Sequence, residues 1–468
     1  MSQLIDLDRL YQAVSEIATQ IIHTAIPDII PVNKGGTGVT TEEEIRSLVT
    51  GTPNKIWNGS NQVVIGPVYQ YVSNSESIMI GADLLPLGVR PTKNIFIGYN
   101  FGLATTNTSG NIIMGMTNAN APELTMLTDN IIFGENNLEK TTYDTDTSAQ
   151  RCLRSVIIGR SNLQGPTDIT DNYIIGQRSF FRSTGRVTQT IAIGHETCAN
   201  RSDTIQGIIL GQSAFTGARA GIPDPTLITS SNDIVIGGFA AQYTAKTVKN
   251  VFIGFQAGTC TSKYTNFSYC IAIGSNAMYG NQIDDLTDAV AIGRNAAVTG
   301  SKQFQLGSSG YTVYAYGAVQ NRSDARDKVN ITDIEYPYRE FIMGLRPVTF
   351  QWDYREDYRG DPDDENYQDG SISEIKKDGT HIRSRRHNGF IAQEVKALMD
   401  SLGFDFAGYQ DHSVNGGDDV LSLGYTEFIA PMVKMIQDLS KKVDVLTKSI
   451  EELKVENAGL KSELQSLK

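Results

Sequence analysis

Short apolar runs that end in glycine recur along about half of the chain. Fourteen such runs lie between Gln62 and Gly307, and the commonest step from one glycine to the next is 17 residues. A fixed short period of this kind predicts a solenoid built from strands. One unit is too small to bury its own apolar face, so we expect the units to stack and several chains to wind together. The repeated glycines are Gly66, Gly81, Gly98, Gly115, Gly134, Gly159, Gly176, Gly194, Gly211, Gly237, Gly254, Gly274, Gly293 and Gly307.

The order of residues within one repeat has a physical explanation. Three apolar or β-branched residues favour a short strand, and the glycine after them permits a corner with positive φ. A small residue often follows three positions later, as at Ala214, Ala257, Ala277 and Ala296, and lets neighbouring coils approach closely. Two longer steps, 134–159 and 211–237, hold polar insertions that we expect to project as recognition loops. An ordinary β-sandwich with many short strands is the alternative. A sandwich, however, gives no reason for a glycine at the same position of all fourteen strands.

Apolar residues at alternating steps of three and four predict helices at both ends of the chain. The N-terminal stripe ends before Pro27, and the C-terminal stripe continues for about five heptads. Such stripes favour coiled coils, although a short helix packed on its own domain would show the same pattern. Asn457 occupies an a position, where a polar residue fixes register, but the stripe itself suits a dimer as well as a trimer. The stripes consist of Leu7, Leu10, Val14, Ile17 and Ile21, and of Ile436, Leu439, Val443, Leu446, Ile450, Leu453, Asn457, Leu460, Leu464 and Leu467.

A glycine-rich segment, 33–38, follows the first stripe and does not form a phosphate-binding loop. That loop needs its lysine after the last glycine, whereas Lys34 precedes the glycines. Thr41 and Glu44 have the spacing of a capping box and predict a short helix from Glu42 to Val49. The segment resembles one found near the virion-proximal end of bacteriophage tail fibres.

Charge and composition narrow the classes of partner. The formal net charge is -12 over 468 residues, so we expect neither nucleic-acid binding nor attraction to an anionic membrane. No apolar stretch reaches the roughly 20 residues that span a bilayer, and no membrane insertion is expected. Cys152, Cys198, Cys260 and Cys270 form no CxxC pair and favour free buried thiols. The histidines are scattered, so we expect no metal and no cofactor.

The segment from Ser323 to Lys328 suggests chemistry. A serine can act as a nucleophile if a lysine with a lowered pKa serves as its base, and Arg326 could supply a nearby positive charge. A spacing of five does not place Ser323 and Lys328 on one helical face. A turn or a neighbouring chain would have to bring the two side chains together, and serine and lysine at this spacing often occur by chance.

Residues 323–468 resemble the intramolecular chaperone auto-processing domain found at the C-terminus of phage tailspikes, endosialidases and L-shaped tail fibres. Four motifs in order carry the resemblance, and they are 323–328 (SDARDK), 344–352 (GLRPVTFQW), 389–395 (GFIAQEV) and 423–431 (LGYTEFIAP). It implies a trimeric α+β foldase that is released by self-cleavage between Arg322 and Ser323. Ser323 would be the nucleophile and Lys328 the general base, with Asp324 and Arg326 as supporting residues. At most this is a single-turnover endopeptidase, with no substrate-turnover activity.

These observations predict a mainly β protein whose trimeric β-solenoid or β-prism shaft lies between coiled coils. The expected function is a homotrimeric phage tail fibre, located on the virion and assembled in the host cytoplasm. Its partners would be a tail or collar protein at the N-terminus and a host-surface receptor, a glycan or outer-membrane component. The expected domains are an attachment helix (1–26), a linker with a short helix (27–60), the solenoid (61–310), a strand-like connector (311–322), the chaperone domain (323–427) and a trimeric coiled coil (428–468).

Three alternatives remain open. The fibre could keep its C-terminal domain as a permanent trimeriser without proteolysis. It could be a polysaccharide-degrading tailspike, although no pair of acidic residues has the spacing of a glycosidase site. The repeats also resemble those in the heads of trimeric autotransporter adhesins. We expect that class to need a secretion signal and an anchor barrel, and neither is recognised in the sequence.

Overall fold

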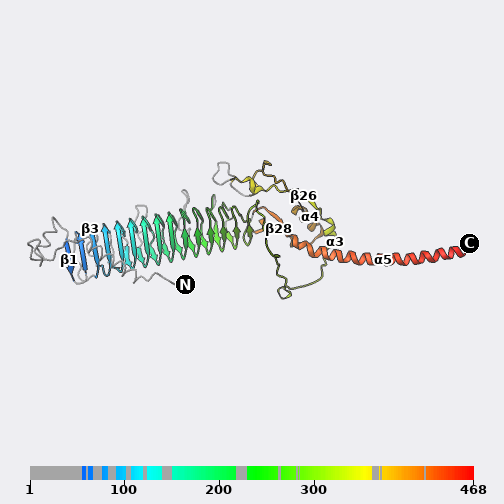
Figure 1. The fold of residues 1–468 in the computed structure, drawn as a ribbon, viewed down its shortest axis with the longest axis horizontal. Coiled ribbons are helices and arrows are strands. Elements are labelled where there is room, and N and C mark those ends of the chain that lie inside the picture. Colours follow the sequence, from blue (N-terminus) through cyan, green and yellow to red (C-terminus); the bar gives the residue numbers. More distant parts are fainter. Residues whose placement is uncertain are drawn as a thin grey trace, which may run out of the picture.

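The computed structural model describes residues 55–59, 62–66, 76–82, 91–101, 107–119, 124–139, 150–217, 229–261, 265–280, 283, 285–360, 368, 372–415 and 418–467. The predicted N-terminal coiled coil, the capping box and both polar insertions lie wholly or largely outside these residues. Within them the chain forms a long shaft of stacked strands, then a smaller mixed region, and finally one extended helix (Figure 1).

The shaft is a β-solenoid with two sheets whose strands pair in parallel, except for β1, which is antiparallel to β2. This confirms the mainly β class and the solenoid. Each regular coil contributes one strand to each sheet, and consecutive coils are hydrogen-bonded neighbours. The fifteen-stranded sheet contains β1 (Lys55–Gly59), β2 (Gln62–Gly66), β3 (Ile78–Ala82), β4 (Ile95–Tyr99), β6 (Ile112–Met116), β8 (Ile131–Glu135), β10 (Val156–Arg160), β12 (Tyr173–Gln177), β14 (Ile191–His195), β16 (Ile208–Leu210), β18 (Ile234–Ile236), β20 (Val251–Ile253), β22 (Ile271–Ile273), β24 (Val290–Ile292) and β25 (Phe304–Leu306). The ten-stranded sheet contains β5 (Asn107–Ser109), β7 (Leu124–Thr128), β9 (Gln150–Leu153), β11 (Asp168–Thr170), β13 (Arg186–Thr188), β15 (Thr204–Ile205), β17 (Ser230–Ser231), β19 (Thr247–Val248), β21 (Asn266–Ser268) and β23 (Asp285–Thr287).

The glycine at the end of each apolar run holds the coils in register. Gly159 pairs with Gly134 on one side and with Gly176 on the other, so the glycines form one column along the shaft. At Gly176, φ is +151°, and a Cβ there would lie 1.8 Å from the carbonyl oxygen of Gly194. Since no side chain fits such an approach, the column requires glycine.

The two sheets enclose a continuous apolar core. The middle residue of each three-residue run points inward, and Ile174, Ala192 and Phe252 are completely buried there. Phe252 on β20 meets Phe267 on β21 across the interior, edge to face, with ring centroids 5.2 Å apart. The predicted small residues Ala214, Ala257, Ala277 and Ala296 are also fully buried. One inward residue from each strand thus fills a core that no single coil could form.

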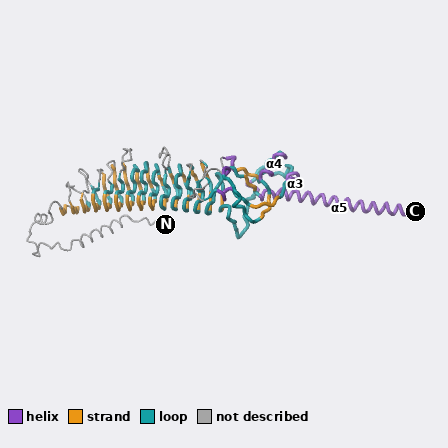
Figure 2. Tube along the Cα trace, turned by 90° about the horizontal axis from the view of Figure 1, so that it is seen from above, coloured by secondary structure: helices purple, strands orange, loops and turns teal. Residues whose placement is uncertain are grey.

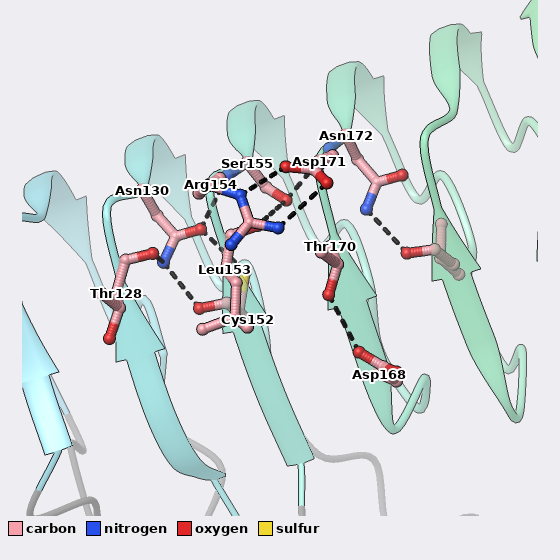
Figure 3. Close-up of polar contacts among 11 residues, drawn as sticks. Thr128, Asn130, Cys152, Leu153, Arg154, Ser155, Asp168, Thr170, Asp171 and Asn172 are labelled. Carbon is pink, nitrogen blue, oxygen red and sulfur yellow. Dashed lines mark hydrogen bonds and ion pairs between the residues drawn. The ribbon is translucent and has the colours of Figure 1, made fainter. Parts of the chain in front are cut away.

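Buried polar ladders close one corner of the solenoid. The side-chain oxygen of Asn111 accepts hydrogen bonds from both the backbone and the side-chain amide of Asn130 in the next coil, at 3.0 and 2.9 Å. Asn130 in turn accepts from the backbone N–H of Ser155 and donates to the carbonyl of Cys152 (Figure 3). Buried backbone N–H and C=O groups need hydrogen-bond partners. At this corner the strand ladders do not supply them, and the asparagine side chains do.

The chain after the last coil differs from the sequence expectation. The sequence predicts a strand-like connector over residues 311–322, but these residues contain no strand. Tyr314, Tyr316 and Val319 are almost entirely exposed, and no strand of the described chain pairs with the segment. A β-favouring sequence without a partner strand gains no ladder hydrogen bonds, so the connector stays irregular.

The C-terminal region is α+β and has its own core. Phe341, Val395, Met399, Phe406 and Phe428 form that core. Its elements are η3 (Ala325–Asp327), α3 (Tyr338–Gly344), β26 (Val348–Gln351), η4 (Arg355–Tyr358), η5 (Ile372–Glu374), β27 (Arg386–Gly389), α4 (Ala392–Leu402), β28 (Tyr409–Asp411), η6 (His412–Asn415), β29 (Leu421–Leu423), η7 (Tyr425–Phe428) and α5 (Ile429–Ser466). Helix α5 has 38 residues and continues the long axis of the shaft in both views (Figures 1 and 2). In the described part of the chain, no helix is long and apolar enough to cross a bilayer.

Replacing Gly176 with alanine tests the glycine column. The new Cβ would collide with the Gly194 carbonyl, so we expect Gly176→Ala to cost at least about 3 kcal/mol and to lower the melting temperature measured by circular dichroism. Gly310→Ala is the control because no atom lies within 4 Å of the place that its new methyl group would take. Equal melting temperatures for the two variants would contradict the close stacking.

Removing one rung tests the asparagine ladder. Asn130→Ala leaves the backbone N–H of Ser155 and the carbonyls of Thr128 and Cys152 without this partner in a buried corner. We expect a loss of about 3 kcal/mol in the free energy of unfolding, measured by denaturant titration. The exposed Gln177 ends the strand β12 of the fifteen-stranded sheet, and Gln177→Ala should change stability by less than about 0.5 kcal/mol. A similarly small effect of Asn130→Ala would show that the ladder does not support the coil.

Candidate functional site

A short 3-10 turn, η3, positions the four candidate residues Ser323, Asp324, Arg326 and Lys328. Asp324 precedes the turn, and its carboxylate accepts a hydrogen bond from the backbone N–H of Arg326 at 2.9 Å. The guanidinium of Arg326 folds back onto the same carboxylate, at 2.6 Å from Nη2 to Oδ2. These bonds lower the pKa of Asp324, the side-chain bond from Arg326 contributing most. Asp324 and Arg326 therefore stabilise the turn as a pair, and the positive charge of Arg326 is paired with the carboxylate of Asp324.

The turn brings Ser323 and Lys328 together. The backbone N–H of Lys328 donates to the carbonyl of Ala325, which closes the turn. The amine Nζ of Lys328 then donates to Oγ of Ser323 over 2.7 Å. A spacing of five needs a turn or a neighbouring chain for this contact, and the turn η3 provides it within one chain.

A second pair with the same spacing brackets the turn and was not selected from the sequence. Nε of Arg322 lies 2.8 Å from a carboxylate oxygen of Asp327. Arg322 to Asp327 and Ser323 to Lys328 both span five residues, so one turn closes both contacts. The ion pair holds the residue before the Arg322–Ser323 peptide bond, while the hydrogen bond holds the residue after it. The repeated spacing of five was the signal available in the sequence.

Ser323 and Lys328 face water in the single chain. Both residues are exposed, and no residue of η3 is buried. A hydroxyl beside an amine is the arrangement of a serine–lysine dyad, in which the neutral amine accepts the serine proton. Removing water from around a lysine favours its neutral form. The hydrogen bond between Lys328 and Ser323 is therefore formed, but the described residues do not shield the lysine from water as its neutral form would require.

Polar contacts join the last coil of the shaft to the C-terminal region. His412 contacts the hydroxyl of Thr299 through Nδ1, and its Nε2 lies 3.0 Å from the hydroxyl of Ser422. The backbone N–H of Asp418 donates to the carbonyl of Thr299 at 2.7 Å. Partial burial lowers the pKa of His412, which favours the neutral ring in this contact. Thr299 thus anchors the C-terminal region to the end of the shaft independently of the connector.

The cysteines and the histidines His381 and His387 contribute to packing in the structure. The four cysteines are free and buried as expected, and desolvation raises the pKa of Cys260 and Cys270 to about 11. His381 packs edge-on against Tyr358, and His387 lies against Phe350 and Trp352. Within the described ranges, no group of three His, Cys, Asp or Glu side chains could hold a metal ion.

Comparison with known families places this site at the start of a recognised domain. Residues 323–404 match the Peptidase_S74 family model, described as chaperone of endosialidase. No curated protein and no solved structure matches the chain. The match begins at Ser323, the residue that follows the Arg322–Ser323 bond, and includes the whole turn. The protein therefore carries a C-terminal chaperone-of-endosialidase domain on a β-solenoid body, an arrangement typical of phage tail fibres and tailspikes.

Proposed function

We propose that the protein is a homotrimeric phage tail fibre or related virion appendage whose C-terminal domain assembles the shaft and is then released by self-cleavage. The contact of 2.7 Å between Lys328 and Ser323, at the first residue of the matched domain, is the observation that carries the cleavage. The products would be the shaft, residues 1–322, and the chaperone, residues 323–468. The N-terminal helix would attach the fibre to a tail or collar protein, and loops or the shaft tip would contact a host glycan or outer-membrane component.

The geometry supports a reaction in two steps. Oγ of Ser323 attacks the carbonyl carbon of Arg322, and the neutral amine of Lys328 accepts the hydroxyl proton. That proton passes to the amide nitrogen of Ser323 as the peptide bond breaks, which leaves Arg322 joined to Ser323 through an ester. The amine of Ser323 is then free. Water hydrolyses the ester in the second step, which leaves a carboxylate on Arg322 and restores the hydroxyl of Ser323. In this scheme the Arg322–Asp327 ion pair positions the carbonyl.

Helix α5 supports assembly with copies of the same chain. Leu446, Ile450 and Leu453 are each at least half exposed, as are the other apolar members of the predicted stripe. A helix of 38 residues is roughly 57 Å long, and such a stripe is stable in water only when other helices cover it. The matched domain implies assembly into trimers in general, so three α5 helices would form the coiled coil.

The cleavage reaction can be tested with substitutions at the dyad. Full-length protein should split into fragments of about 35 and 16 kDa, in proportion to 51.1 kDa over 468 residues. Ser323→Ala and Lys328→Arg should both remain whole on a denaturing gel. Arginine keeps the charge and can donate a hydrogen bond to Ser323, but it cannot accept a proton, so Lys328→Arg separates the base from a structural role. Hydroxylamine should speed cleavage of the wild-type chain because it attacks esters.

The control for this experiment is Lys376→Arg, an exposed lysine in the same domain that should leave cleavage unchanged. A wild-type chain that stays whole and trimeric would contradict self-cleavage. The C-terminal domain would then be a permanent trimeriser.

The role of α5 can be tested with two adjacent residues. Leu446 lies in the stripe and Val445 lies outside it, yet they are 61% and 64% exposed in the single chain. We expect Leu446→Asp to reduce the trimer seen by analytical ultracentrifugation at least about tenfold, because three carboxylates would be buried together. Val445→Asp should leave the trimer intact. Equal behaviour of the two variants would exclude the stripe as the contact between chains.

A further inference from the structure

The outward face of the fifteen-stranded sheet is apolar along the shaft. In its strands the first and third residues of each run point away from the core, while the middle residue points inward. In β14 the inward Ala192 is completely buried, whereas the outward Ile191 and Ile193 are 37% and 41% exposed. From β10 to β24 every one of these outward positions holds Val, Ile, Leu or Tyr. The next outward position, after the glycine, is charged in β8 and β10, where Glu135 and Arg160 lie 3.5 Å apart. The apolar strip therefore consists of the first and third positions, and a strip of this composition is unusual on a protein that carries a net charge of -12.

The outward face of the ten-stranded sheet is polar. Arg151 on β9 and Asp168 on β11 form an ion pair at 2.7 Å, and Arg186 on β13 lies 3.6 Å from Asp203. Thr170 and Thr188 occupy further outward positions. Both sheets belong to the same coils, and each turns buried residues toward the shared core, although those of β15, β17 and β19 are the polar Thr204, Ser230 and Thr247. Core packing therefore does not explain the difference between the outer faces. The polar face suits water, whereas the apolar face needs a cover.

The size of the apolar face agrees with a role in assembly. At the N-terminal end of the sheet, the outward Ile95, Ile112 and Ile131 already form a buried cluster separate from the core. The open part covers the eight strands from β12 to β25, which at about 4.8 Å per strand extend over roughly 38 Å. Three residues at about 3.3 Å each give a width of roughly 10 Å, so the strip covers roughly 380 Å². That area lies within the range of the largest apolar patches on monomers, which are often functional, and it is below the roughly 800 Å² per partner of a standard interface. The exposed stripe of α5 continues the same axis and would add to it (Figure 1).

We infer that the outward face of the fifteen-stranded sheet is the surface through which two further copies of this chain pack along the shaft. The inference rests on the proposed homotrimer and identifies which face of the solenoid it buries. Copies of the chain are the occupants that fit, because a symmetric trimer places the same uncharged strips around one axis and leaves the ion-paired faces in water. Each chain carries the same net negative charge, and apolar strips at the interface keep the charged side chains of the three copies apart.

Cysteine accessibility tests the inference, since the four native cysteines are buried and provide a low background. Ile193→Cys and Thr188→Cys introduce one thiol each in the same coil, on opposite outward faces. In the single chain Ile193 is the more exposed of the two positions. In the assembled trimer we expect maleimide labelling at position 193 to be at least about tenfold slower than at position 188. Brief oxidation of Ile193→Cys should also link two copies through the new thiols, and denatured protein should label fully at both positions.

The outcomes separate this inference from the proposed function. A trimer by analytical ultracentrifugation in which the thiol of Ile193→Cys labels as fast as that of Thr188→Cys would overturn the inference and leave the trimer standing, with the face open to another partner. A wild-type chain that is monomeric would overturn both. Ile175→Cys, one coil away on the same face, repeats the measurement if Ile193→Cys is insoluble.

Discussion

The close approach of successive coils at the glycine column is the constraint on which the shaft depends. From Gly81 to Gly274, a Cβ on each glycine of the column would collide with the carbonyl of the next, so the coils can stack only in the register that aligns the glycines. That register sets which residues of each run point inward, because side chains alternate along a strand. The core, the asparagine ladders and both outer faces follow from this single alignment. A shift of one residue would expose the core and bury the ion pairs.

Much of the shaft could be predicted because its signal is repeated. The glycine period indicated the solenoid, and the helix Ile429–Ser466 agrees with the heptad stripe. The asparagine ladder was missed, although Asn94, Asn111 and Asn130 each stand directly before an apolar run. A polar residue there looks like an ordinary turn residue until the fold shows that the corner is buried. The connector was assigned incorrectly because strand propensity cannot reveal that no partner strand is present.

The candidate site was less accessible to sequence reasoning. Ser323 and Lys328 lie five residues apart, a spacing that matches neither a helix face nor a strand face. Their roles came from family resemblance, whereas their contact comes from the turn that Asp324 caps. The sequence suggested Arg326 as a positive charge near Lys328, whereas in the structure its guanidinium pairs with the carboxylate of Asp324. Local pairing therefore favours a role for Asp324 and Arg326 in shaping the turn.

The exposure of the dyad connects the site to assembly. Long-range pairing of several chains is slow and prone to aggregation, so a domain that holds them together is useful only until the shaft has formed. If cleavage needs a desolvated lysine, an exposed dyad keeps the chaperone attached to an unassembled chain. Burial of the turn between assembled chains would then make release a consequence of trimer formation. The contacts of Thr299 with His412 and Asp418 do not involve the connector, so breaking the Arg322–Ser323 bond would leave them in place. Chemical cleavage and physical departure of the domain would therefore be separate steps, the second governed by this polar junction.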